Sequence, residues 1–222
     1  MSLSCSAGNA VILVIACVTK TRTISSVTDS ASNSGWVNAN TNGGGGSTSG
    51  YCAIWWNPSL PSSITTVTLH YSGTTKVQVG VLEVTGLAGT VDVSPARQDN
   101  TTATTSPGIT ATTTNADDFL VCGVGATTAP TAASSPFTLQ AGATGGSGVG
   151  IRIGVATDEE TSTGTYTCTF TTVSETSSAL MATFAVASTV VPPRKGFYHT
   201  SMGLLARPPL PPPSRLPRVA WR

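Results

Sequence analysis

This sequence is poor in charge. Asp, Glu, Lys and Arg make up 9% of its 222 residues, against roughly a quarter in ordinary soluble domains. Thr, Ser, Gly and Ala take their place and give a polar but weakly charged surface. Such a composition is atypical of cytosolic enzymes and typical of secreted, cell-surface or virion β-proteins. Weakly charged faces also favour assembly over dispersal.

Histidine is scarce, and the cysteines lack the spacing of metal ligands. His70 and His199 are the only histidines, and the sequence contains no G-x-S-x-G motif. These features argue against a Ser-His-Asp hydrolase. No CxxC pair occurs, and no histidine lies at ligand spacing from a cysteine, which argues against a zinc site. We therefore predict that the protein is not an enzyme and has no catalytic residue, metal or cofactor.

The cysteines are odd in number and follow no disulfide framework. Three of them lie inside apolar or alternating runs, where a free thiol behaves as a small buried hydrophobic group. We expect all five to be unpaired, with a Cys17–Cys168 or Cys52–Cys122 bridge as the alternative.

Positive charge is absent from the first nine residues, before the most apolar run of the chain. This run, Ala10–Val18, is followed by Lys20 and Arg22, which is the reverse of a secretory signal peptide. Nine residues are also too few to cross a bilayer as a helix. We expect a buried central strand, with a targeting segment as the alternative, and no membrane partner.

The sequence does contain a series of short strand patterns. Ile64–Tyr71 and Lys76–Val84 alternate apolar with polar residues, as strands with one wet face do. Similar segments recur between Gly, Asn, Ser or Pro clusters, and no window has a helical period. Parallel sheets need crossover helices, so the predicted fold class is all-β, an antiparallel β-sandwich of jelly-roll type. We find no internal repeat.

Two parts of different composition meet near Val190. Residues 1–190 hold five basic residues against ten acidic ones, a net charge of −5, whereas residues 191–222 hold six basic residues and no acid. The second part is also rich in proline, which removes backbone donors from a sheet. We predict a β-sandwich domain over 1–190 and a basic, proline-rich extended arm, without sheet, over 191–222.

The arm carries more apolar residues than a solvated linker needs. Residues 207–217 favour polyproline II, whose unpaired backbone can bind a partner. We expect the arm to lie on a neighbouring subunit, with disorder as the alternative for an isolated molecule. Its charges are sparse for packaging nucleic acid, which is not expected as a partner. The residues predicted to contact a partner are Arg194, Lys195, Phe197, Tyr198, Arg207, Leu210, Arg215, Leu216, Arg218 and Trp221.

Three aromatic residues form a second candidate site. Tyr51, Trp55 and Trp56 follow a glycine-rich segment over residues 42–50, and exposed aromatics on jelly rolls can bind sugars. Aromatics total only 6% of the sequence, and a sandwich needs most of them for its core. A carbohydrate-binding or adhesive surface module is therefore the alternative function.

Acidic residues near turns have two interpretations. Asp29 with Asn33, the pair Asp117 and Asp118, and the run 158–160 all flank predicted strands. Such side chains cap turns by accepting hydrogen bonds from backbone N–H groups, and loop carboxylates can also bind Ca²⁺. None has EF-hand spacing, so we predict turn capping.

Five segments share an order with a known group of domains: Gly8–Ala16, Ile24–Asp29 followed by Asn33 and Trp36, Ile64–Tyr71, Val79–Gly86 and Ala116–Val121. Together they resemble a β-sandwich domain that recurs in bacteriophage structural proteins and in bacterial surface proteins. The resemblance covers about residues 8–186 and implies a virion or cell-surface module.

We therefore predict a non-enzymatic virion structural protein. It would be a capsid, collar or tail decoration or accessory protein, anchored to neighbouring subunits by its C-terminal arm. The expected partners are other virion proteins, in a homo-oligomer or a larger assembly, and a host-surface glycan is a further candidate. The expected location is the virion surface, with an extracellular or bacterial cell-surface location as the alternative.

Overall fold

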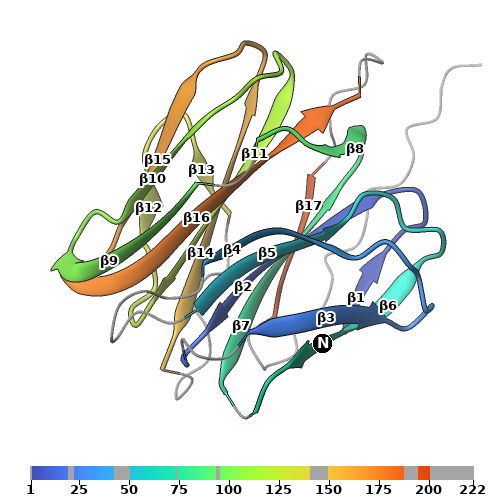
Figure 1. Cartoon of the computed structure of the whole chain (residues 1–222), viewed down its shortest axis with the longest axis horizontal. Helices are drawn as coiled ribbons and strands as arrows, with labels where there is room; N and C mark the ends of the chain where they lie inside the picture. Colours follow the sequence, from blue (N-terminus) through green and yellow to red (C-terminus); the bar gives the residue numbers. More distant parts are fainter. Residues whose placement is uncertain are drawn as a thin grey trace, which may run out of the picture.

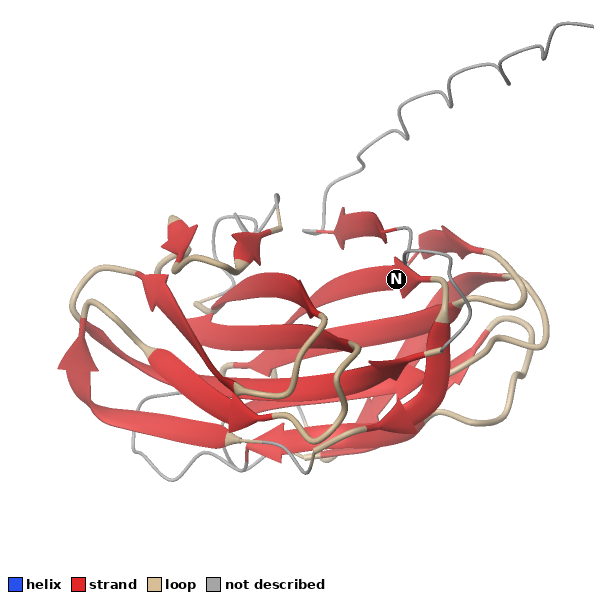
Figure 2. Cartoon of the chain, turned by 90° about the horizontal axis from the view of Figure 1, so that it is seen from above, coloured by secondary structure: helices blue, strands red, loops and turns tan. Residues whose placement is uncertain are grey.

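The computed structural model describes residues 2–19, 23–42, 51–73, 75–93, 96–140, 150–187 and 195–200. Seen from above, these residues form strands joined by loops and turns, and none is helical (Figure 2). The described part of the chain accordingly holds no helix of the length and apolarity needed to cross a membrane.

The strands form four sheets in which every neighbouring pair is antiparallel. The first outer sheet has the order β1 (Ser2–Cys5), β6 (Ile64–Tyr71), β3 (Ile24–Asp29). The first inner sheet has the order β17 (Lys195–Thr200), β7 (Val77–Val84), β2 (Ala10–Cys17), β5 (Tyr51–Asn57), β4 (Val37–Asn42). The second inner sheet has the order β13 (Thr138–Leu139), β14 (Arg152–Glu160), β11 (Asp118–Ala126), β16 (Glu175–Val186), β8 (Leu87–Val91), and β9 (Arg97–Thr104) also pairs with β16. The second outer sheet has the order β10 (Gly108–Thr112), β15 (Thr165–Thr171), β12 (Ala132–Ala133).

These sheets stack as four layers. In Figure 1 they follow one another from the β10–β15–β12 sheet at upper left to the β1–β6–β3 sheet at lower right. One apolar cluster, the middle cluster, lies between the two inner sheets, and each inner sheet packs a further cluster against its outer sheet. The predicted all-β antiparallel class is confirmed, and the sheets pack face to face as in β-sandwiches.

Burial on both faces explains the most apolar segments of the sequence. Every residue of β2, β5 and β11 is buried, because an inner sheet has another sheet on each side. Such a strand needs no polar face, so its sequence reads as a continuous apolar run rather than as an alternation. The buried central strand predicted over Ala10–Val18 is confirmed over Ala10–Cys17 by β2, whereas Val18 lies beyond the strand and is exposed.

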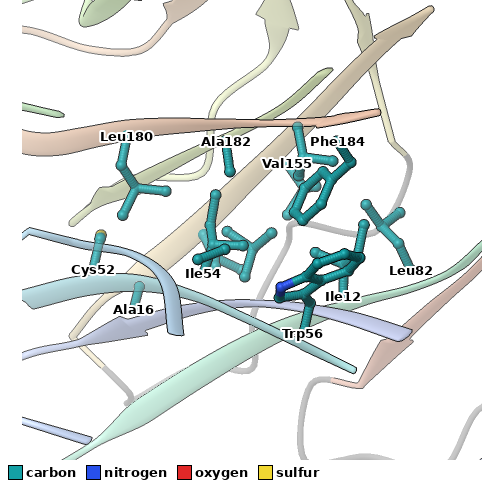
Figure 3. Close-up of a cluster of buried hydrophobic side chains, with 14 of the residues drawn as sticks. Ile12, Ala16, Cys52, Ile54, Trp56, Leu82, Val155, Leu180, Ala182 and Phe184 are labelled. Atoms are coloured by element: carbon teal, nitrogen blue, oxygen red, sulfur yellow. The ribbon is translucent and has the colours of Figure 1, made fainter. Parts of the chain in front are cut away.

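The middle cluster packs side chains of both inner sheets against one another (Figure 3). The ring centroids of Trp56 and Phe184 lie 4.7 Å apart, one ring from each inner sheet. Elsewhere glycine lets the two sheets approach: a Cβ on Gly123 would overlap the Val14 side chain, and one on Gly125 would lie 2.6 Å from the Cys52 Sγ. Close packing of this kind holds the inner sheets at one fixed separation.

The two halves of the chain repeat one strand order. Residues 2–84, the first half, form β1-β6-β3 and β7-β2-β5-β4. Residues 108–186, the second half, form β10-β15-β12 and β16-β11-β14-β13. Each strand of the second half is the counterpart of the strand nine places earlier. The strand order therefore repeats although the sequence shows no internal repeat. Packing requires apolar residues at matching positions, and different amino acids meet that requirement.

Each half also pairs with strands from the segment that follows the other half: two strands for the second half and one for the first. β8 and β9 follow the first half and pair with β16 of the second. β17 follows the second half and pairs with β7 of the first. The prediction that residues 191–222 contain no sheet is therefore wrong over Lys195–Thr200. These six residues lie between two proline clusters and contain no proline themselves, so each can donate its backbone N–H.

Candidate functional site

The pairing of β17 with β7 fixes where the C-terminal segment leaves the body. The register runs from Lys195 opposite Val84 to Thr200 opposite Val79. Before β17, the Ala187 N–H donates to the Gly86 carbonyl at 2.8 Å, which brings the end of the second half beside the end of β7. Thr200, the last described residue, therefore lies near the beginning of β7, and the tail, residues 201–222, follows it in the sequence.

β7 is a rigid template for this added strand. Its other edge pairs with β2 over eight residues, and Val81 and Leu82 are buried. The Glu83 Oε1 accepts hydrogen bonds from the Ser6 N–H and the Asn9 Nδ2, both at 2.7 Å, which ties the end of β7 to the β1–β2 turn. Without β17, β7 would be the edge of a sheet whose faces are both buried, the kind of edge that pairs with other chains.

The predicted arm residues are divided by this arrangement. Lys195, Phe197 and Tyr198 lie together in β17, so their strand pairs with the body of the same chain instead of extending away from it. The other predicted contact residues lie outside the described residues: Arg194, Arg207, Leu210, Arg215, Leu216, Arg218 and Trp221. A proline-free hexapeptide with two adjacent aromatics is the signal that could have revealed β17.

The aromatic platform predicted for glycans is wrong. Tyr51, Trp55 and Trp56 lie on β5 and are only 1%, 8% and 2% exposed. Trp56 packs in the middle cluster, whereas Tyr51 and Trp55 pack between the first outer and inner sheets. Adjacent residues on a strand face opposite sides, and here both sides are covered because β5 belongs to an inner sheet.

A polar groove, which the sequence did not point to, lies beside β9 and β10. It has a volume of about 570 Å³, and its lining is almost entirely hydroxyl and amide side chains with the carboxylate of Asp99. Several of these groups are already hydrogen-bonded within the protein. Asp99 accepts from the Ser178 Oγ at 2.9 Å, Asn100 donates to the Ser177 Oγ at 3.0 Å, and the Thr110 and Thr167 hydroxyls lie 2.8 Å apart. The Thr-rich sequence over 99–114 is the feature that could have indicated it.

Turn carboxylates act as clamps, as predicted for Asp29. Its two oxygens accept hydrogen bonds from the Ala31 and Asn33 N–H groups, both at 3.0 Å, and from the Trp36 Nε1 at 2.7 Å. Within the described residues, no three His, Cys, Asp or Glu side chains converge as metal ligands. Like Asp29, Glu175 holds a turn in place, because its carboxylate accepts hydrogen bonds from the Thr127 and Thr128 N–H groups.

Asp118 differs from these clamps. Its side chain is 0% exposed, and no described donor reaches either carboxyl oxygen. Burial, together with the neighbouring carboxylate of Asp92, raises the pKa of Asp118 to about 7. Burial also acts to raise the pKa of Asp92, but hydrogen bonds from Thr114 and Asn115 outweigh it and lower that pKa. The proton of this pair therefore resides on Asp118.

The five cysteines are free and buried, as expected from their odd number. The alternative bridges are excluded by position. Cys17 lies between the first outer and inner sheets, whereas Cys168 lies between the second pair; Cys52 faces the middle cluster and Cys122 faces away from it. Burial raises the pKa of Cys17 to about 12, so its thiol is unreactive at neutral pH.

No protein-family model matches the sequence, and no curated protein or solved structure matches it either. The likeness of the five segments to phage and cell-surface domains therefore remains a resemblance of pattern. What can be said of function rests on the geometry of the sheets, on β17 and on the charge of the two parts.

Proposed function

We propose that this chain is a structural subunit of a larger assembly and is held in that assembly by residues 201–222. The observation that carries the proposal is the pairing of β17 with β7, which gives the tail a fixed starting point on a rigid body. The tail holds four arginines and no acid, whereas residues 1–190 carry a net charge of −5. A basic segment leaving an acidic body is attracted to the body of the next subunit.

The proposed assembly is a virion, with the chain as a capsid, collar or tail decoration protein. The resemblance of the five segments supports this assignment, and so does the outward face of the second outer sheet. β10 and β15 contain no charged residue. Across them, Thr110 pairs with Thr167 at 2.8 Å and Thr112 with Thr165 at 2.9 Å through their hydroxyls. Such a face lacks the like-charge repulsion that keeps copies apart.

We propose further that each half is an incomplete jelly roll. In the first half the β2–β5 pair is nested within the β1–β6 pair, and in the second half β11–β14 is nested within β10–β15. Nested antiparallel pairs are what a long hairpin makes when it is rolled into two sheets. An eight-stranded jelly roll has one more strand than the seven of each half, and the segment after each half joins the other half instead.

Truncation after Thr200 tests the proposed function, because it removes the tail and leaves β17 in place. We expect the truncated chain to unfold at the same temperature as the full chain and to be lost from particles sedimented from the producing cells. Full-length variants with Arg207, Arg215 and Arg218 replaced together by Glu or by Lys separate charge from length. The Glu variant should also be lost, and the Lys variant should be retained. Equal sedimentation of truncated and full-length chains would contradict the proposal.

A further inference from the structure

Two strands of this chain, β8 and β17, each pair with the edge of the other half, but the connections that lead to them differ in length. β8 begins three residues after β7 ends, so the segment that joins β16 is held close to its origin. β17 begins nine residues after β16 ends. A longer connection restricts its strand less, and loop-closure entropy makes its pairing within one chain correspondingly less favoured.

From this difference we infer that β17 is also donated between copies of this chain: the β7 edge of one copy accepts Lys195–Thr200 of a second copy. The inference rests on the proposed function and names the partner of the tail as another copy of the same protein. Strand addition is held by main-chain hydrogen bonds, which are the same whether the strand comes from its own chain or from a neighbour. Exchange of an identical element between copies therefore costs little.

The acceptor edge is suited to an incoming strand. Its position is fixed by eight pairs with β2 and by the hydrogen bonds to Glu83. It also extends beyond the described pairs with β17, which end at Val79, to Val77 and Gln78. The Gln78 amide is 6% exposed, and neither its nitrogen nor its oxygen has a described partner. A chain that continued past Thr200 along this edge would bring polar backbone groups towards that amide.

Concentration decides which chain supplies the strand. The same pairs form in either case, so the balance depends on the effective concentration of the tethered strand against that of strands on neighbouring copies. Dilute protein should keep its own β17. In an assembly, where copies are held side by side, exchange should dominate and carry residues 201–222 onto the next subunit.

A cross-strand cysteine pair distinguishes the two arrangements. Val79 and Thr200 are directly opposite in the register, and opposite residues on antiparallel strands lie within the Cα separation of a disulfide. Val79→Cys chains and Thr200→Cys chains, with different tags, are coexpressed so that exchange can occur during folding. The purified protein is oxidised at a series of concentrations and separated by non-reducing electrophoresis. Val81→Cys coexpressed with Thr200→Cys is the off-register control, because Val81 is opposite Tyr198.

We expect a disulfide-linked dimer of the two tagged chains whose fraction rises with concentration, and none in the off-register control. In dilute solution the double variant Val79→Cys/Thr200→Cys should close within one chain. If the double variant closes within one chain and the coexpressed single variants give no dimer at any concentration, the exchange is overturned and the proposed function is untouched. If neither closes, the β7–β17 pairing fails, and with it the observation on which the proposed function depends.

Discussion

The two halves of this molecule share a strand order but fill their common interface with different residues. Where Val14 and Cys52 of the first half approach the second half, β11 presents Gly123 and Gly125, although Phe119 and Val121 of the same strand also belong to the middle cluster. Val14 on β2 packs on Gly123 on β11, the counterpart strand. A repeated topology therefore does not require a repeated amino-acid sequence, because the interface needs two complementary surfaces rather than two identical ones.

The two halves differ in one buried carboxyl group. Glu83 in the first half and Glu175 in the second each accept hydrogen bonds from backbone and side-chain donors. In the second half Asp118 has no described donor and retains its proton beside Asp92. The second half is therefore the one whose stability should depend on pH near neutrality, and four changes test these contrasts.

Trp56→Ala should have the largest effect. The ring fills the middle cluster against Phe184 and is 2% exposed, so its loss leaves a cavity between two fixed sheets. Truncations of this kind cost about 3–5 kcal/mol. Chemical denaturation should show the loss, and Trp56→Phe should recover about half of it. An exposed binding aromatic would show little change on truncation, so unchanged stability would contradict the burial of Trp56.

Gly123→Ala should destabilise the fold by about 3 kcal/mol, at the upper end of overpacking effects. The added methyl overlaps Val14, and both residues lie on strands that are buried on both faces. In a protein of this size the loss lowers the unfolding temperature by roughly 6–12 °C. The double variant Val14→Ala/Gly123→Ala restores space, and a double-mutant cycle should show a favourable coupling. Additive effects would mean that the two strands do not meet at this point.

Asp118→Asn should change the pH dependence of stability. The pKa of Asp118 is about 7 in the folded state and about 3.9 in an unfolded chain. Between these values the folded state binds a proton that the unfolded state lacks, so stability falls as pH rises from 4 through 7. In the Asp118→Asn variant the side-chain amide donates a hydrogen bond to Asp92 at every pH, so the fall of the unfolding free energy with pH should disappear.

At pH 8 the Asp118→Asn variant should therefore be the more stable protein, by on the order of 2 kcal/mol. Denaturation measured at pH 5 and at pH 8 gives the comparison. Asp117→Asn removes a charge at an exposed neighbouring position. The charge of Asp117 is the smallest of the causes that raise the pKa of Asp118, so this variant should keep most of the slope. Equal slopes in all three proteins would refute the shared proton.

The sequence allowed strands to be predicted, but it did not allow the stacking of four sheets to be predicted. The run Ala10–Val18 was recognisable as a buried strand because no polar residue interrupts it. Trp55 and Trp56 were misplaced because their burial depends on two sheets that cover β5 from either side, and the pairing of distant strands leaves no local signal. β17 was missed because the surrounding prolines dominate the composition. Asp118 was recognised only as a turn residue, since its lack of a donor depends on contacts across three strands.

Thr167→Val should have the smallest effect, and it separates the outward faces from the inner ones. Thr167 is exposed on β15, and its hydroxyl pairs with that of Thr110. Valine keeps the shape and the strand preference, so the free energy of unfolding should change by less than about 0.5 kcal/mol. If this face takes part in assembly, as proposed, the same change should alter the sedimentation of particles without altering the unfolding temperature. Thr165→Val is the matched change at the next hydroxyl pair, and a large loss of stability in either variant would show that this face is part of the core.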